Sequence, residues 1–479
     1  MGNSSFELWL LTVTLGPMQA KTEIRPGETP VHADANRTLA VTAAGTLLVL
    51  AVFMAAVTTA RQSSHSLHGG LSGQTWILSG MSLGLAAALL TVGALADELG
   101  RRRILVLSSA LLALTSALGA VAPNVDVLVA ARILQGAAGA GVLSAALGAI
   151  GHAFPTGRHR IRATSVWASA VGAGITIGPL AGGALAVSLG WRSSYWVQAL
   201  AAAALVPAAA GLPESRAAAR RSLDLSGAVT LAVAMACLTA GLVDCRHSWS
   251  AAGTIIPLAV GAILLPAFAG IELRKREPML ELSRFSQPLF VASVTGALFT
   301  GLGVIGLMSF APVLLQNGLH INVIGSAGVL AAWSATSTAI ALATRPLVGR
   351  LSAPSVLALG FAISAAGEFA LAGLGVDSPW TRLLPGLAVL GIGSGLVNAS
   401  LGRLAVESVP RERAGMGSGA NNTARYLGGA AGVALVVALA TSRRTASAAG
   451  LLTGWNTAAI VCGALCLLAA LLAAVLQTR

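Results

Sequence analysis

Long apolar runs, separated by short polar gaps, fill the chain from residue 39 to its end. Each run holds about 20 residues, which is the length that a helix needs to cross a bilayer. The pattern predicts fourteen membrane-spanning helices, at residues 39–60, 74–96, 104–122, 126–152, 163–189, 194–212, 224–243, 251–272, 289–315, 321–344, 354–376, 383–406, 414–441 and 455–476. The segment 1–38 is polar and of mixed charge, so we expect a cytoplasmic N-terminal arm there.

The composition indicates the same fold class, an all-α polytopic membrane protein. The chain is 55% hydrophobic and only 10% charged, whereas soluble domains carry about 25% charged residues. Its 56 glycines allow helices to pack closely in a membrane. The net charge of +13 does not indicate nucleic-acid binding, because the cations recur in the short gaps between apolar runs.

The distribution of Arg and Lys predicts the orientation. With the N-terminus inside, most of the cations in the gaps fall on the cytoplasmic side, as orientation signals do. We therefore expect a multi-pass protein of the cytoplasmic (plasma) membrane with both termini in the cytoplasm.

Signals for catalysis or metal binding are weak. The cysteines Cys237, Cys245, Cys462 and Cys466 lie in or at the ends of apolar runs, so we interpret them as packing residues rather than zinc ligands or disulfides. The spans contain no HExxH motif, clustered carboxylate pair or Ser/His constellation. We expect no enzymatic activity, no cofactor, no metal site and no nucleic-acid partner.

The hairpin Gly93–Arg103, with the sequence GALADELGRRR, joins two apolar runs through a short, charged turn. One interpretation is a polar turn that carries only orientation charges. However, the pattern Gly-x-Leu-x-Asp-x-x-Gly-Arg-Arg-Arg between two spans closely resembles the loop between helices 2 and 3 of major facilitator superfamily transporters. The resemblance implies a conformational or gating role for Gly93, Asp97, Gly100, Arg101, Arg102 and Arg103.

An internal repeat extends the resemblance to the whole fold. GPLAGGA at 178–184 and GGAAG at 428–432 each lie in the fifth span of a six-span block, and Gly349-Arg350-Leu351 stands where a degraded second hairpin would fall. The major facilitator fold implies two six-helix bundles, 39–212 and 289–479, joined by a linker, 213–288, with two additional helices. Such halves rock about a site at their interface.

The fourth predicted span contains an arginine, Arg132, about 9 Å from its outer end. A charge at the bilayer centre costs about 3 kcal/mol, so this side chain should face protein or water, unless it snorkels to the outer surface. Gln135, Gly136 and Gly139 share its face. Because a glycine-lined face is a packed or pore-lining face, we expect Gln135 at the cavity. The run resembles the fourth-helix motif of proton-coupled members of the superfamily, which implies a role for Arg132 in proton coupling.

The fifth predicted span has glycines at every fourth position, Gly174, Gly178 and Gly182, beside Pro179 and Gly183. The glycines form a smooth groove, and Pro179 frees the carbonyl of Ile175 so that the helix can kink. The run resembles the antiporter motif of the superfamily, which implies export rather than import.

The C-terminal half narrows the resemblance to the fourteen-helix drug/proton antiporter branch, through Val409–Gly432 and the segments at 223–227 and 277–282. Polar groups inside a span need partners. Asn421, Asn422 and Arg425, and also Asn398, therefore either contact substrate in the cavity or bond neighbouring helices.

Glu368 is the only acid well inside a span. Burial favours the neutral form of a carboxyl group, so Glu368 can act as a proton carrier. The alternatives are a structural pair with Arg425 and a permanently neutral acid.

One departure from the branch concerns the first span, where Phe53-Met54-Ala55 replaces the usual Asp-x-Thr. The resemblance then gives no acid on a cavity helix, and the intramembrane arginines favour neutral or anionic substrates.

The sequence as a whole predicts a monomeric, proton-coupled exporter of amphipathic small molecules, such as antibiotics or other drugs, that works by alternating access with membrane lipid around it. The alternatives are a metabolite importer or uniporter of the same superfamily and a non-transporting membrane sensor.

Overall fold

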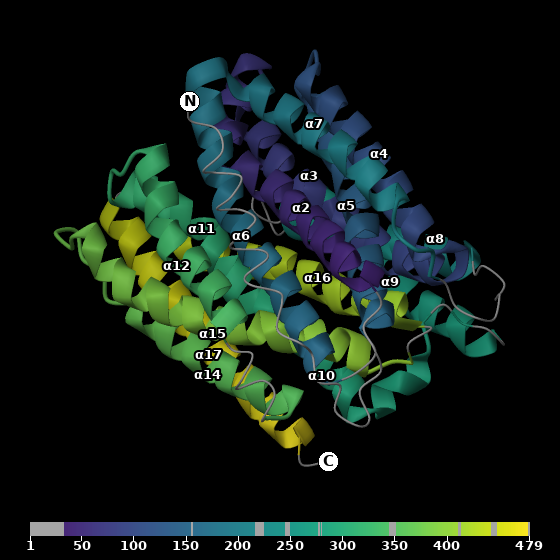
Figure 1. The fold of residues 1–479 in the computed structure, drawn as a ribbon. Helices are drawn as coiled ribbons and strands as arrows, with labels where there is room; N and C mark the ends of the chain where they lie inside the picture. The colour runs from purple at the N-terminus through teal and green to yellow at the C-terminus, as the bar shows by residue number, and fades with distance from the viewer. Residues whose placement is uncertain are drawn as a thin grey trace, which may run out of the picture. The chain divides into compact units, whose positions relative to one another are not determined.

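Every regular element that the computed structural model describes is a helix (Figure 1). The described residues are 33–154, 157–215, 225–244, 250–275, 278, 280–343, 351–410, 413–441 and 448–477. Residues 1–32 of the predicted arm, Cys245 and the pair Gly349-Arg350 lie outside this part of the chain. The first helix begins at Ala33, so the end of the predicted arm is helical.

Each predicted span corresponds to a helix or, for the ninth, to a run of helical segments. The first eight helices are α2 Ala33–Ser66, α3 Gly70–Leu99, α4 Arg101–Ala120, α5 Val125–Ala153, α6 Arg158–Leu189, α7 Trp191–Ala210, α8 Leu225–Asp244 and α9 Ala252–Arg274. The last five are α12 Val323–Ala343, α14 Ala353–Ala370, α15 Leu383–Glu407, α16 Ala414–Thr441 and α17 Ala448–Gln477, and short 3₁₀ turns lie at Leu282–Ser286 (η1) and Trp380–Arg382 (η4).

The ninth span is not a uniform α-helix. It runs from α10 Pro288–Phe299 through the π-helical segment η2 Thr300–Ile305 and α11 Gly306–Val313 to a second π-helical segment, η3 Leu314–Gly318. Stretches of π-helix are rare and frequently lie at functional sites.

By length and hydropathy, twelve helices of the described chain can cross a membrane. Helix α7 is not among them, and the apolar part of α8, Ser226–Leu242, is shorter. Helix α4 shows how such a helix meets lipid, because large apolar side chains are exposed along one of its faces, at Leu107, Leu111, Leu114 and Leu118.

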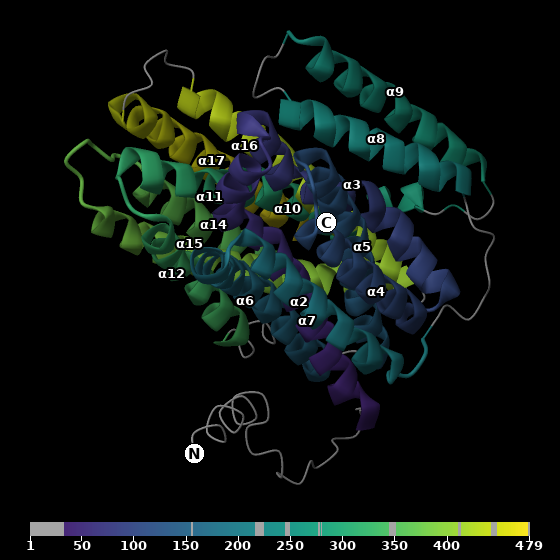
Figure 2. The ribbon, with the colours of Figure 1, turned by 90° about the horizontal axis from the view of Figure 1, so that it is seen from above.

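The first and fifth helices of each six-helix block pack against each other through glycines. A Cβ atom built on Gly178 of α6 would lie 2.5 Å from the carbonyl oxygen of Ala51 on α2, and one on Gly432 of α16 would collide with the carbonyl of Leu302 in η2. The two glycine motifs of the predicted repeat therefore make equivalent close contacts. The additional helices α8 and α9 pack against each other, with α8 along α3, at one edge of the bundle (Figure 2).

Candidate functional site

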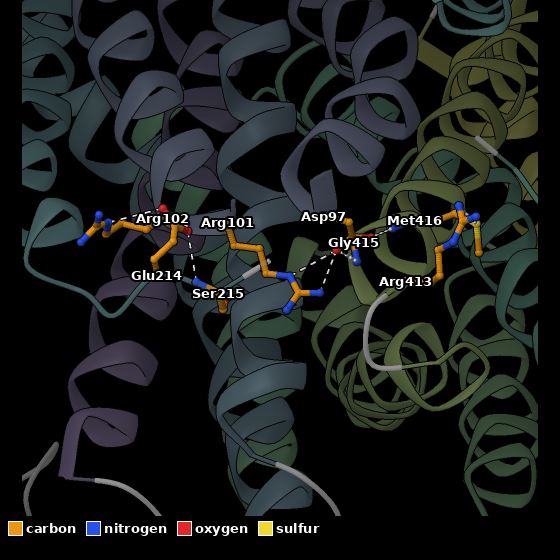
Figure 3. A network of polar contacts seen from close by, with 8 residues as sticks. All are labelled: Asp97, Arg101, Arg102, Glu214, Ser215, Arg413, Gly415 and Met416. Atoms are coloured by element: carbon orange, nitrogen blue, oxygen red, sulfur yellow. Dashed lines mark hydrogen bonds and ion pairs between the residues drawn. The ribbon is translucent and has the colours of Figure 1, made fainter. Parts of the chain in front are cut away.

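Asp97, near the end of α3, contacts the first residues of α16 (Figure 3). Its carboxylate accepts hydrogen bonds from the backbone N–H groups of Gly415, at 3.0 Å, and Met416, at 2.9 Å. Arg101 donates to the same carboxylate from Nε at 3.2 Å and from Nη2 at 2.8 Å. Asp97 is only 4% exposed. We call the two backbone hydrogen bonds the Asp97 contact.

The Asp97 contact depends on helix geometry and on close approach. The N-terminus of a helix has free N–H groups and a positive dipole end, both of which stabilise a carboxylate. A Cβ atom on Gly93 would lie 2.5 Å from the carbonyl oxygen of Gly415, so α3 and α16 cross almost backbone to backbone. Gly100, with φ of 112°, then turns the chain from α3 into α4, a conformation that favours glycine.

The other two arginines of the hairpin lie beside a residue that the sequence analysis missed, Glu214. Its carboxylate accepts a hydrogen bond from the backbone N–H of Arg102 at 3.2 Å, and lies 3.5 Å from Nε of Arg102 and 3.9 Å from Nε of Arg103. The backbone N–H of Arg101 donates to the carbonyl of Ser215 at 2.9 Å. The only signal in the sequence was an acid in the gap after the sixth span.

A cavity of about 200 Å³ lies elsewhere in the bundle, and none of the residues of the Asp97 contact lines it. It is lined by residues of α2, α3, α6, the α10–η3 run, α12, α15 and α16, so both six-helix blocks contribute. Its lining residue on α3 closest in sequence to Asp97 is Ser82. The separation of Ser82 and Asp97 along α3 is about 22 Å at 1.5 Å per residue. The cavity therefore lies towards the end of the bundle opposite the Asp97 contact.

Aromatic groups and hydroxyls form much of the cavity wall. The rings of Phe53 and Tyr426 meet edge to face across the two blocks, with centroids 5.9 Å apart. The indole N–H of Trp333 donates to the hydroxyl of Ser394 at 3.0 Å. None of these four residues was singled out as a cavity residue from the sequence, because an aromatic or serine in an apolar run has no distinctive spacing.

Arg132 is 1% exposed and is fixed by helix carbonyls. Its guanidinium donates to the carbonyl oxygens of Ile77 on α3, at 3.2 Å, and of Val52 and Phe53 on α2, at 3.1 and 3.3 Å. It also donates to Gln135 at 3.0 Å, which in turn donates to the hydroxyl of Ser116 at 2.8 Å. Arg132 thus faces protein, as predicted, and does not snorkel.

The predicted cavity residues separate into two groups. Asn398 and Arg425 lie in the cavity lining, whereas Gln135, Asn421 and Asn422 are not among the described lining residues. The amides of this second group bond to neighbouring helix groups instead: Asn421 donates to the carbonyl and hydroxyl of Ser293, both at 3.0 Å, and Asn422 donates to the carbonyl of Ser418 at 3.0 Å. The alternative of hydrogen bonding to a neighbouring helix therefore fits Asn421, whereas Asn422 bonds within its own helix, α16.

Glu368, on α14, is completely buried. Its carboxyl oxygens accept no hydrogen bond from an N–H or O–H group of the described residues, and the thiol of Cys466 on α17 lies beside them. A Cβ atom on Gly303 of η2 would lie 3.8 Å from its Oε1. Within the described chain Glu368 forms no ion pair with Arg425, so that alternative is wrong.

Pro179 connects the antiporter-like motif to the cavity. Pro179 and Thr58 both lie in the cavity lining. The hydroxyl of Thr58 donates a hydrogen bond to the carbonyl oxygen of Pro179 at 3.2 Å. Gly174, Gly178 and Gly182 lie on the face that packs against α2, while Gly183 has looser contacts with Thr58.

Comparisons with known proteins agree with this arrangement. Residues 39–433 match the family model described as "Major Facilitator Superfamily". The chain is 30% identical over 387 residues to the "Tetracenomycin C resistance and export protein" of Streptomyces glaucescens, covering 79% of this chain and 70% of that protein. It is 28% identical over 371 residues to "Multidrug resistance protein Stp" of Mycobacterium tuberculosis, covering 77% and 68%.

A solved structure confirms the fold. The crystal structure of the human organic anion transporter MFSD10 (TETRAN) superposes with a TM-score of 0.68 over 92% of this chain and 100% of that chain, at 19% identity. The family and the fold are those of membrane transporters of small molecules and not of enzymes. The protein is thus a multi-pass membrane protein that belongs to the major facilitator superfamily.

Proposed function

We propose that this protein exports amphipathic small molecules, such as antibiotics, across the cytoplasmic membrane in exchange for protons. It acts as a monomer within the lipid bilayer, with both termini in the cytoplasm. The names of its relatives, which are resistance and export proteins, support export of this substrate class.

The observation that carries the proposal is the position of the Asp97 contact relative to the cavity. The contact joins the two blocks at one end, and the cavity between them lies towards the other end. Alternating access requires such a pair of features, since one end must close while the other admits or releases the substrate. In this proposal the halves 39–212 and 289–479 rock, and the linker 213–288 with α8 and α9 stays at the edge.

The gating residues have distinct parts in this motion. Asp97 and Arg101 hold the cytoplasmic end closed, Gly93 allows the crossing of α3 and α16, and Gly100 with Arg102 and Arg103 supports the turn. Helices α6 and α2 move together in this proposal. The surface of α6 that packs against α2 is formed by Gly174, Gly178, Pro179, Gly182 and Gly183.

Proton coupling is assigned to Glu368, with Arg132 as a supporting residue. The segment η2 lies next to Glu368 through Gly303 and lines the cavity through Thr300, Val304 and Ile305. Protonation of Glu368 removes a buried charge beside a segment with a π-helical rather than α-helical hydrogen-bonding pattern, so it can shift the cavity wall. Arg132 fixes α2 against α3 and keeps Phe53 in place.

Inverted membrane vesicles test this proposal. A growth screen in an efflux-deficient host first identifies toxic compounds against which the protein confers resistance. Vesicles energised by a proton gradient should then accumulate a selected compound, and a protonophore should abolish the accumulation. Glu368→Gln should still exchange the compound down its own gradient but should not concentrate it. Accumulation that persists without a proton gradient, or a Glu368→Gln variant with full proton-driven accumulation, would overturn the coupling mechanism.

A further inference from the structure

The cavity lining carries a single kind of charge. Among the described lining residues Arg425 is charged, and the others are apolar residues, hydroxyl-bearing residues, Asn398 and Gln316. No described Asp, Glu, Lys or His belongs to the lining. The one charged group described there would therefore repel a cationic substrate and attract an anionic one.

Arg425 is buried without the partners that other buried arginines of this chain have. It is 5% exposed, and its Nε and Nη2 have no hydrogen-bond partner among the described residues. By contrast, Arg132 donates to three carbonyls and an amide, and Arg101 is paired with Asp97. A guanidinium remains charged at all physiological pH values, and leaving it buried and unpaired is costly. An anion that enters the cavity would supply the missing partner.

The surroundings of Arg425 indicate what the rest of that anion is like. Tyr426, the next residue, contacts Phe53 edge to face, and Trp333 lies in the same wall. A planar apolar body can pack against these rings while a carboxylate reaches the guanidinium. The guanidinium presents its donors in a planar fork that matches a carboxylate in two parallel hydrogen bonds.

We propose that Arg425 binds a carboxylate of the substrate and that the cavity selects amphipathic anions with a planar apolar body. This inference rests on the proposed export function, which it makes specific. It also assigns different roles to the intramembrane arginines: Arg132 holds two helices together, and Arg425 recognises the ligand.

Binding of a matched pair of probes tests the proposal independently of transport. Fluorescein carries a carboxylate next to a planar ring system, and its methyl ester lacks that carboxylate. Fluorescence anisotropy of the purified, full-length protein in detergent gives the dissociation constant of each probe. Wild type should bind fluorescein about tenfold more tightly than the ester, or more, since the ester cannot form the charge-assisted hydrogen bonds of a carboxylate with the guanidinium.

Arg425→Gln should remove this preference while its thermal unfolding stays close to wild type. The control Arg162→Gln removes the same charge from an exposed position near the start of α6 and should leave the preference intact. The comparison of two protein forms with two probes isolates the pairing of guanidinium and carboxylate. If Arg425→Gln fails to fold, Asn398→Asp decides instead, because an acid in the lining should reduce the preference while Arg425 remains.

Two results would overturn the proposal. One is a wild-type protein that binds both probes equally, or neither. The other is a preference for fluorescein that survives in Arg425→Gln or, if that variant does not fold, in Asn398→Asp. A wild-type protein that prefers fluorescein through Arg425 but moves no compound in vesicles would support this inference and count against the export function alone.

Discussion

Two carboxylates lie close to the same hairpin but differ in their surroundings. Asp97 is buried and holds the backbone N–H groups of Gly415 and Met416 together with Arg101. Glu214 is partly exposed and faces Arg102 and Arg103, whose side chains are also partly or largely exposed. Water competes with the second set of interactions much more than with the first. The two residues should therefore contribute very differently to closure of this end.

Asp97→Asn should weaken the Asp97 contact strongly. The amide of Asn is uncharged and has only one acceptor oxygen, so one backbone N–H of α16 loses its acceptor and the buried guanidinium of Arg101 loses its ion pair. Breaking a buried pair costs about 3 kcal/mol or more, which corresponds to about a hundredfold in the opening equilibrium. Hydrogen exchange, measured by mass spectrometry on peptides that cover the start of α16, should speed up by that order, and transport should be lost.

Glu214→Gln is the control for this measurement. It preserves the acceptor for the N–H of Arg102 and removes only partly exposed ion pairs, so exchange at the start of α16 should stay near the wild-type rate. Equal protection of Gly415 and Met416 in wild type and Asp97→Asn would show that the carboxylate does not hold this end closed.

The sequence predicted the charged hairpin of the Asp97 contact but not the residues of α16 that it contacts. The hairpin was recognisable because five charges stand between two apolar runs. Its partners were not, because Gly415 and Met416 contribute backbone N–H groups from a helix that begins more than 300 residues later. The partner of Asn421, Ser293, was hidden for the same reason, because it lies on another helix; for both Asn421 and Asn422 the sequence left substrate contact and hydrogen bonding between helices open.

At the scale of elements, the contact between α2 and α6 is set by glycines at every fourth position. Cβ atoms on Gly174 and Gly178 would each lie 2.5 Å from a carbonyl oxygen of α2, at Leu47 and Ala51. The spacing keeps all of these positions on one face of α6. Gly183 lies on a neighbouring face, where a Cβ would be 3.6 Å from Thr58, an ordinary contact distance.

Gly178→Ala should therefore destabilise the protein, whereas Gly183→Ala should not. The added methyl group at 178 has to displace the backbone of α2, and overpacking of this kind costs about 1–3 kcal/mol. At 183 the methyl group fits, and the better helix propensity of Ala, by about 1 kcal/mol, favours the folded state. Thermal unfolding of the purified variants in detergent compares them directly. A similar fall in the unfolding temperature for both would contradict the packing argument.

The helices themselves were largely predictable, but their internal irregularity was not. Apolar runs predicted the spans because the bilayer fixes both their length and their polarity. The π-helical segment Thr300–Ile305 has the same apolar, glycine-containing composition as its α-helical neighbours. Composition does not distinguish these hydrogen-bonding patterns, so the irregularity of the segment beside Glu368 and the cavity could not be predicted.

At the scale of the membrane-embedded bundle, the Asp97 contact and the cavity should be coupled. If the two blocks move as units, separation at the Asp97 end closes the end where the cavity lies, and the reverse holds as well. Coupling of this kind is reciprocal, since a change that disfavours one state raises the population of the other. A steric wedge placed at the Asp97 end should therefore be detectable in the cavity.

Gly93→Leu provides this wedge, because its side chain would collide with the backbone of α16 at Gly415. The readout is a cysteine at Ser309, an exposed residue of α11 in the cavity lining, in a protein whose four native cysteines are replaced by alanine. A membrane-impermeant maleimide, added to the outside of intact cells, should label Ser309→Cys readily. Gly93→Leu should slow this labelling by about tenfold, because overpacking of about 1–3 kcal/mol disfavours the state in which α3 and α16 touch.

Gly270→Leu is the control, since it adds the same side chain at a glycine of α9 with open space around it, and it should leave the labelling rate unchanged. Faster or unchanged labelling in Gly93→Leu would mean that the two ends open and close independently, and a rocking mechanism would no longer describe this protein.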